Sequence, residues 1–489
     1  CPGCPFHQKL EGTAPDGRNW TAIAGPYWPA FAQAWAKCWA PLLDSVLSQK
    51  CQHIAGWIPL GHLSSVQDSL STSGFQPGGH RSLEVIAKRV FAGVQPTRRA
   101  LPTLLPEGLG PDTHLELALQ VPHPYTLPSP LSEPCQYAFK GQIALGSSIN
   151  EFRNAVCKLI QELSDACLRI DPLDLTWIHP ILVSVIKDRN CSFIREVSWV
   201  TCVPDLNFLP HYLFGFDVHG WAMHDPLATP RMVTPVYPPE TILNDVGTHN
   251  SRILARCKSS GDPSLDAASW AKSSDEFKSG SLKGPYYSFA DLPFPADMFR
   301  LLLRFPIWEQ HGGATEPTCR NIDNGLQGGQ NNFLGMQYTT RPADIDSIIA
   351  LVRSLMELFP DTCLRGFTSD FKSAYRQATA NPLHAHLWIL AIYDPVKGCP
   401  CFAIAAAQLF GCSAAPLNFC RIPGWCSFMT SRLFCLAFVS CIDDMITVEC
   451  DSHADVAYKA WRLFASLCGW NIPDEKSPPP TQAFRALGA

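Results

Sequence analysis

Residues 439–450 read VSCIDDMITVEC, and residues 364–371 read LRGFTSDF. Aromatic, apolar and β-branched residues dominate both stretches, which is typical of strands. The pair Asp443-Asp444 lies between two such runs and predicts the tip of a hairpin, while Asp370 follows the strand-like run of the other stretch. If these strands are neighbours, the three acids come close together.

Three carboxylates at one end of a sheet form the oxygen-rich kind of site that Mg²⁺ prefers. Their mutual repulsion opposes full ionisation without a cation, so we expect metal binding and ionisation to be coupled. Adjacent strand residues point to opposite faces, so Asp443 is expected to be the full metal ligand of the pair and Asp444 to lie at the edge. Taken alone, an Asp-Asp pair is explained more simply as a turn held by Asx hydrogen bonds.

The flanking sequence alternates helices and strands. Apolar residues at helical spacing predict a helix over residues 345–359 and another over about 454–467. HLWILAIY and CFAIAAAQ flank the turn DPVKG at 394–398 and predict a hairpin, and GWNI at 469–472 predicts a short strand. Helices and strands therefore alternate along this part of the chain.

Composition bounds the partners and the compartment. The formal net charge of -5 gives no basic signature, which argues mildly against a nucleic-acid binder. The 21 cysteines lie mostly in apolar runs, so we expect them to be reduced and buried. Neither a signal-peptide pattern nor a run of about 18 apolar residues occurs, so we expect an intracellular protein, nuclear or cytoplasmic, without a membrane segment. Cys1, Cys4 and His7 could belong to a zinc site, but the intervening Pro and Gly favour a flexible end.

Five motifs follow one another in the second half of the chain. They are CRNIDNGLQGGQNN (319–332), DFKSAYRQ (370–377), QLFGCSAAPLNFCR (408–421), CIDDM (441–445) and GWNIPDEKSPPPTQAFRALG (469–488). Their order resembles that of the reverse transcriptase family, most closely the polymerases of retrotransposons. Each motif alone is common, but all of them in the right order, over about residues 273–489, are much harder to obtain by accident.

The resemblance implies an α+β right-hand polymerase: a palm of antiparallel strands backed by helices, with partial fingers. It implies DNA synthesis on an RNA or DNA template, with a primer and deoxynucleoside triphosphates as the other partners, by two-metal catalysis with Mg²⁺ or Mn²⁺. By this resemblance the expected metal ligands are Asp370, Phe371, Asp443 and Asp444, with Asp370, Asp443, Asp444 and Lys476 as the catalytic residues.

The resemblance also assigns roles to the residues after Asp370. Tyr375 is expected to be the gate that packs where a ribose 2′-hydroxyl would lie, favouring deoxynucleotides. The backbone of Phe371, Ser373 and Ala374 is expected to lie along the incoming triphosphate.

Further roles follow for residues outside that motif. Phe410 and Gly411 are expected to support the nascent base pair. Arg320 is expected to contact triphosphate oxygens through its planar fork, with an ion pair to Asp323 as the structural alternative. Lys476 is expected to protonate the leaving pyrophosphate, and an exposed loop lysine is nearly as good an explanation.

Three departures from the family pattern bear on activity. Thr318 stands where a Lys is expected, Cys441 replaces an aromatic residue, and Leu409 stands where Pro is common. The chain ends at Ala489, so we expect the thumb and RNase H domains to be absent. An inactive remnant that at most binds nucleic acid is therefore the main alternative.

The expected organisation combines these motifs with the composition. A proline-rich stretch and a Ser- and Gly-rich stretch predict linkers, and an amphipathic helix beginning near Asn150 marks a folded unit between them. The predicted units are an unassigned region (1–95), a linker (96–134), a helical domain of unknown role (135–257), a linker (258–284), the fingers (285–340) and the palm (341–489).

The turn around Ser413 suggests a second enzyme class. Residues 411–415, GCSAA, are similar to the nucleophile elbow of α/β-hydrolases, and Asp443 and His453 follow in the right order. Ala415 replaces the usual final Gly, and few residues separate the Asp from the His. This hydrolase alternative is the weaker interpretation.

Overall fold

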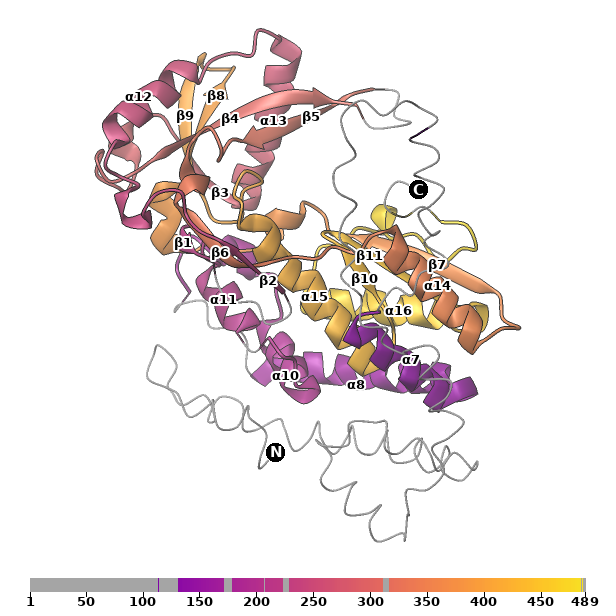
Figure 1. Cartoon of the computed structure of the whole chain (residues 1–489). Helices are drawn as coiled ribbons and strands as arrows, with labels where there is room; N and C mark the ends of the chain where they lie inside the picture. The colour runs from indigo at the N-terminus through magenta and orange to yellow at the C-terminus, as the bar shows by residue number, and fades with distance from the viewer. Residues whose placement is uncertain are drawn as a thin grey trace.

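The computed structural model describes residues 131–170, 178–205, 207–222, 228–310, 316–484 and 486, together with position 113. The unassigned region 1–95, with its weak zinc candidate, and most of the predicted linker 96–134 lie outside these residues. The described chain is an α+β structure in which helices pack against sheets, as the sequence predicts (Figure 1). None of its described helices has the length and apolar character needed to cross a bilayer.

One sheet, here called the aspartate sheet, contains β7 (Leu364–Asp370), β10 (Val439–Cys441) and β11 (Asp444–Cys450). The order is β10-β11-β7 and both pairings are antiparallel. The predicted strand and the predicted hairpin with acids at its tip are confirmed.

Two helices cover the aspartate sheet, α14 (Ile345–Leu358) and α16 (Asp451–Cys468), both near their predicted positions. Alternate residues of β11 belong to different cores, as the strand period requires. Ile446 and Val448 share a core with α14, whereas Met445 shares one with Trp461 of α16. The alternation fixes which face of β11 meets which helix.

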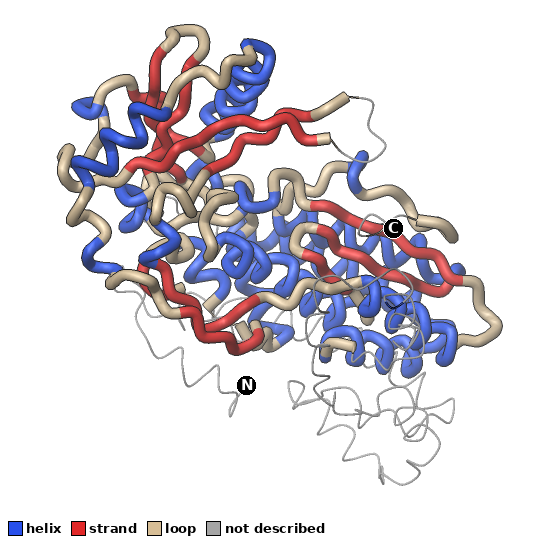
Figure 2. The backbone as a smooth tube through the Cα atoms, turned by 45° about the horizontal axis from the view of Figure 1, so that its top comes forward, coloured by secondary structure: helices blue, strands red, loops and turns tan. Residues whose placement is uncertain are grey.

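A second sheet, here called the mixed sheet, has the order β3-β9-β8-β4-β5. Its strands are β3 (Leu282–Tyr286), β4 (Leu301–Glu309), β5 (Thr318–Asp323), β8 (Ile389–Asp394) and β9 (Cys399–Ala405). β8 and β9 form the predicted hairpin, and β4 runs parallel to β8. Figure 2 shows β4 and β5 extending together as a long ribbon away from the other strands.

The helices α12 (Val246–Arg256) and α13 (Pro263–Ser279) pack against the mixed sheet. α13 occupies most of residues 258–284, so the prediction of a linker there is wrong. An Asp and a Gly of the stretch that suggested a linker stand at the two ends of this helix. Asp262 caps the first turn by accepting from the amides of Ser264 and Leu265 at 2.9 and 3.2 Å, and Gly280 ends the helix with φ of 77°.

The predicted short strand at residues 469–472 is also absent. Gly469 ends α16 in the left-handed region, with φ of 81°, and the following residues form a loop. The carbonyl of Asn471 accepts from the Lys372 amide at 3.0 Å, and its amide donates to Gln377 Oε1 at 2.9 Å. The loop is therefore tied to the segment after β7 without joining a strand ladder.

A small sheet and six further α-helices also belong to the described structure. The sheet joins β1 (Gly220–Trp221), β6 (Leu334–Thr339) and β2 (Thr229–Val233) in that order. The helices are α7 (Glu133–Leu145), α8 (Ile149–Ile170), α9 (Val183–Ile186), α10 (Cys191–Thr201), α11 (Phe208–Phe214) and α15 (Ala415–Phe434).

The residues predicted to form a separate helical domain, 135–257, do not have a core of their own. Phe152 of α8 belongs to the same hydrophobic core as Trp425 of α15 and Trp461 of α16. Figure 1 shows α7 and α8 lying beneath α15 and α16. The amphipathic helix predicted near Asn150 is confirmed as α8, but its apolar face packs on the part of the chain that carries the acids.

A buried ion pair joins α8 to β11. Arg153 donates to both carboxylate oxygens of Glu449, at 2.9 and 3.2 Å, and to the carbonyls of Phe434 and Cys435. Neither side chain of the pair is exposed to solvent. Such a pair is costly to break from one side, because the remaining charge stays buried.

We predict that Arg153→Met lowers the free energy of unfolding by about 3–5 kcal/mol, because it leaves Glu449 buried without its counter-charge. Lys278→Met removes an exposed ion pair with Asp275 and should change it by less than about 0.5 kcal/mol. Urea unfolding of both variants measures this, and equal small effects would show that the pair contributes little.

Candidate active site

The three predicted acids meet at one end of the aspartate sheet. The register of β7 and β11 places Asp370 directly opposite Asp444. The amide of Phe371 donates to the carbonyl of Asp443 at 3.3 Å, so the chain just after β7 touches the hairpin tip. Residues 370 and 443, which are far apart in the sequence, therefore lie side by side.

A strained residue shapes the hairpin tip. Cys441 pairs with Asp444, leaving Ile442 and Asp443 as a two-residue turn. Ile442 has φ of 54°, a conformation that β-branched residues rarely adopt. Such strain costs on the order of 1–3 kcal/mol and gathers at functional sites. The sequence analysis assigns no role to Ile442. The signal that could have revealed the strain was a β-branched residue at a position where a two-residue turn needs a positive φ.

Burial and nearby negative charge raise the pKa of Asp443 and Asp444. Burial raises the pKa of Asp444 to about 6, with further contributions from the negative charges of Asp443 and Asp370. Burial also raises the pKa of Asp443, and the charge of Asp370 adds to this effect. Lys476 partly opposes the shift at both positions. The shifts of Asp443 and Asp444 are in the direction expected for a site that resists full ionisation.

Asp370 is held by Lys476, which lies on the short turn η10 (Asp474–Lys476). Lys476 Nζ donates to Asp370 Oδ2 at 2.5 Å, and the lysine side chain is about half exposed. Asp370 Oδ1 is buried and has no hydrogen-bond partner among the described residues. The structure brings the predicted lysine into the acidic site, where it contacts a carboxylate.

The acids fit a hard divalent cation by their chemistry. Carboxylate oxygens suit Mg²⁺ or Mn²⁺, and the buried, unpartnered Asp370 Oδ1 is an acceptor that a cation would satisfy. In the described part of the chain, however, no three His, Cys, Asp or Glu side chains already stand in metal-binding arrangement. Binding would require side chains of the site to turn and Lys476 to release Asp370.

Aromatic rings form a cluster next to the acids. Tyr375 lies on the turn η8 (Ala374–Gln377), and its ring centroid is 4.6 Å from that of Phe410 and 5.6 Å from that of Phe419. Tyr375 is buried, and burial raises its pKa to about 12, so its hydroxyl stays neutral near pH 7. Phe410 is 52% exposed and forms the open side of the cluster.

Arg320 of β5 reaches the same place from the mixed sheet. Its Cζ lies 5.9 Å from the ring centroid of Phe410, and its charge lowers the proton affinity of Asp443. Its ion pair is with Glu309 at 2.8 Å. The structural alternative, a pair with Asp323, is wrong because Asp323 is buried between Arg304 and Arg376 instead.

Gly411 lies against the mixed sheet so closely that no side chain fits. A Cβ at this position would lie 1.5 Å from the carbonyl oxygen of Asp323. Asn331 holds the same turn, donating to the carbonyl of Gly411 at 2.8 Å and accepting from the amide of Ser413 at 3.0 Å. The sequence analysis assigns no role to Asn331, which lies in the stretch CRNIDNGLQGGQNN; the available signal was an amide side chain two residues after a Gly pair.

The remaining predicted backbone positions form the bend between β7 and η8. Ser373 is in the left-handed region, with φ of 53°, and its carbonyl accepts from the Arg376 amide at 2.7 Å. Phe371 and Ala374 are buried. The bend therefore turns the chain from the acids directly into the ring cluster.

The hydrolase alternative does not survive this geometry. Asp443 precedes β11 and His453 follows it, so the seven-residue strand separates them. At about 3.3 Å per residue, the strand holds them roughly 20 Å apart. Ser413, Asp443 and His453 therefore occur in the expected order along the sequence, but Asp443 and His453 are too far apart to form a catalytic triad.

Comparisons with known proteins are weak. No family model matches the chain, and no curated protein matches it. Among solved structures, it is similar to native prototype foamy virus protease-reverse transcriptase, with 12% identity and a TM-score of 0.31 over 63% of this chain and 34% of that one. The CSH mutant of the same viral protein gives 13% identity and a TM-score of 0.31 over 63% of this chain and 34% of that chain. The chain spans about a third of the length of these structures, and a TM-score this low does not decide the fold.

The raised pKa of Asp444 predicts a specific pH dependence. Its value rises from 3.8 to about 6, so the folded state holds the proton more tightly and stability falls as pH rises from about 4 to about 6. Without divalent ions, Asp444→Asn should flatten this decline and be more stable than wild type at pH 7, by on the order of 1 kcal/mol after screening.

Asp455→Asn is the matched control, because a hydrogen bond from Arg365 lowers the pKa of this exposed acid. It should not flatten the decline between pH 4 and 6. Chemical unfolding in a chelating buffer at several pH values measures both variants. A pH profile of Asp444→Asn identical to that of wild type would contradict the assigned electrostatics.

Proposed function

We propose that the chain is a reverse transcriptase, which adds deoxynucleotides to a primer 3′-hydroxyl on an RNA or DNA template. One observation carries the proposal: Asp370 and the Asp443-Asp444 tip meet on paired strands, beside a ring cluster that an arginine of a second sheet also reaches. In this proposal residues 341–489 act as the palm and 285–340 as the fingers.

The acids supply the metal site in this proposal. Asp370 and Asp443 would hold Mg²⁺ or Mn²⁺, with Asp444 at the edge and the Phe371 carbonyl as an additional oxygen donor. Bound there, a pair of such cations would supply activation of the attacking hydroxyl and neutralisation of charge on the phosphates. Lys476 lies within reach of the same carboxylates, so it can move from Asp370 toward the leaving pyrophosphate and donate a proton there.

The ring cluster and Arg320 form the nucleotide site in this proposal. The half-exposed Arg320 leaves Glu309 to bind triphosphate oxygens, for which its planar fork is well suited. The exposed ring of Phe410, on the Gly411 turn, supports the nascent base pair. Tyr375 fills the space beside Phe410 and excludes a ribose 2′-hydroxyl, because its ring is packed on two sides and cannot easily move away.

An inactive remnant remains the second candidate, and two observations favour it. Thr318 supplies no positive charge where the family pattern has Lys. The carboxylates, as described, are not yet arranged as a closed ligand set. Such a protein would keep the fold and at most bind nucleic acid.

The first test is primer extension with Mg²⁺, comparing wild type with Asp443→Asn. Loss of one metal-binding carboxylate should reduce incorporation at least about 100-fold, because transition-state charge is no longer neutralised. Asp451→Asn, an acid at the far end of β11, is the control and should stay active. Extension lost only in Asp443→Asn supports the enzyme, and extension absent from all three proteins supports the remnant.

The second test concerns sugar selection. Tyr375→Val removes the ring that fills the 2′ position, so the ratio of kcat/KM for deoxynucleotides over ribonucleotides should fall about tenfold or more. Tyr393→Val, on β8 of the mixed sheet, is the matched control. Single-nucleotide incorporation measures both ratios, and an unchanged ratio in Tyr375→Val would refute the gate.

A further inference from the structure

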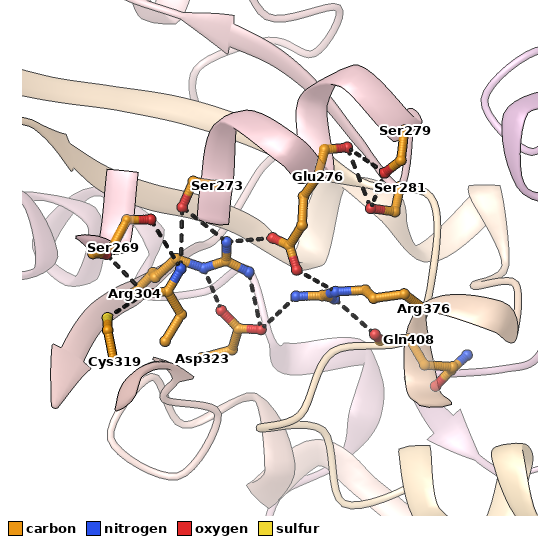
Figure 3. A network of polar contacts seen from close by, with 11 residues as sticks. Ser269, Ser273, Glu276, Ser279, Ser281, Arg304, Cys319, Asp323, Arg376 and Gln408 are labelled. Carbon is orange, nitrogen blue, oxygen red and sulfur yellow. Dashed lines mark hydrogen bonds and ion pairs between the residues drawn. The ribbon is translucent and has the colours of Figure 1, made fainter. Parts of the chain in front are cut away.

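A buried network of charged side chains connects the ring cluster to the mixed sheet. Two arginines and two acids form it: Glu276 of α13, Arg304 of β4, Asp323 at the end of β5, and Arg376 of η8 (Figure 3). The arginines and acids balance in number. No residue of this network was singled out for a role in the sequence, except Asp323 as a possible partner of Arg320.

The guanidinium of Arg376 donates hydrogen bonds to three separate segments of the chain. Nε donates to Glu276 Oε1 at 2.6 Å, Nη2 to Asp323 Oδ2 at 3.2 Å, and Nη1 to the carbonyl of Gln408 at 2.8 Å. Its side chain is only 10% exposed. The planar fork therefore fixes three directions at once, which a lysine could not do.

Arg304 locks the two acids from the other side. It donates to both oxygens of Asp323, at 2.7 and 3.3 Å, and to Ser273 at 3.2 Å, and it pairs with Glu276. Burial alone would raise the pKa of Glu276, but the charges of Arg376 and Arg304 outweigh it and lower the pKa to about 2. Glu276 therefore stays ionised near neutral pH and, together with Asp323, holds Arg376 in place.

The position of Arg376 links this network to the proposed gate. It follows Tyr375 directly on η8, and its contact at Gln408 is two residues before Phe410. The rings of Tyr375 and Phe410 touch at 4.6 Å between centroids. The Arg376 guanidinium is thus tied to the backbone beside both rings. Arg376 itself follows Tyr375, and its partner Gln408 lies two residues before Phe410.

We infer that Arg376 is a positioning residue for nucleotide selection: it holds Tyr375 and Phe410 in register and ties them to β5, which carries Arg320. The inference rests on the proposed function for its catalytic consequence. A buried ion network is weak evidence for stability, because well-packed apolar residues serve as well. What it supplies here is a fixed geometry, which selection of a sugar requires.

The test uses Arg376→Lys, which keeps the charge but loses the fork. The ratio of kcat/KM for deoxynucleotides over ribonucleotides should fall about tenfold, with a smaller change in kcat for deoxynucleotides. Arg153→Lys is the matched control: a buried arginine with a carboxylate and carbonyl partners, distant from the ring cluster, whose loss should leave the ratio unchanged.

Hydrogen exchange gives a readout independent of activity. The amide of Ala378 donates to Tyr375 at 3.2 Å, and that of Gln408 donates to Ala378 at 2.9 Å. In Arg376→Lys both should exchange about tenfold faster than in wild type, with no such change in Arg153→Lys.

These readouts separate the two claims. Unchanged exchange at both amides overturns the positioning role, whatever the activity. Faster exchange with an unchanged sugar ratio overturns the role in selection. If wild type incorporates no nucleotide, the proposed function fails, while the exchange rates still support or overturn the positioning of this segment by Arg376.

Discussion

The antiparallel pairing of β7 with β11 is the constraint on which the candidate site depends. In the observed register Asp370 faces Asp444, and the pairing runs without interruption to Leu364 opposite Cys450. A slip by one residue would turn every side chain of one strand to the other face. The two cores that pack against alternate residues of β11 oppose such a slip, since it would bury the wrong side chains. Ordinary strand and helix packing thereby places acids of distant sequence position side by side.

The mixed sheet contributes Arg320 to the candidate site. A few specific contacts join this sheet to the part of the chain that carries the acids. Gly411 meets the carbonyl of Asp323 so closely that only a glycine fits, and Asn331 holds that turn by two hydrogen bonds. Arg376 joins the same Asp323 from the segment after the acids. These contacts bring Arg320 and Phe410 beside the acids. The proposed nucleotide site therefore depends on how the two sheets are joined as well as on the acids.

Much of the local structure could be predicted from the sequence. Both hairpins, the strand before Asp370 and the helices α8, α14 and α16 follow from patterns of apolar residues, which report local burial directly. The linker predicted at 258–284 failed because Asp, Ser and Gly serve both as loop residues and as helix caps. The strand predicted at 469–472 failed because its polar backbone groups found partners outside any ladder. Local composition could not distinguish a capped helix from a linker, or a strand from a hydrogen-bonded loop.

For the site, the sequence could predict which residues approach the acids but not their partners. Lys476 contacts Asp370 and Arg320 lies near the ring of Phe410, yet Arg320 pairs with Glu309, and Asp323 pairs with two arginines from other segments. Such pairings depend on the packing of elements distant in sequence, which no local pattern encodes. The positive φ of Ile442 could not be predicted either, because isoleucine favours strand conformation and gives no sign of a strained turn.

The central claim is that Asp370 and Asp443 together form a divalent cation site. Crystals soaked in Mn²⁺ and measured at an anomalous wavelength test it most directly. The account predicts a manganese peak in contact with carboxylate oxygens of both residues, with Lys476 moved away from Asp370. An intact contact between Lys476 and Asp370 at saturating Mn²⁺, with no peak at the hairpin tip, would contradict it.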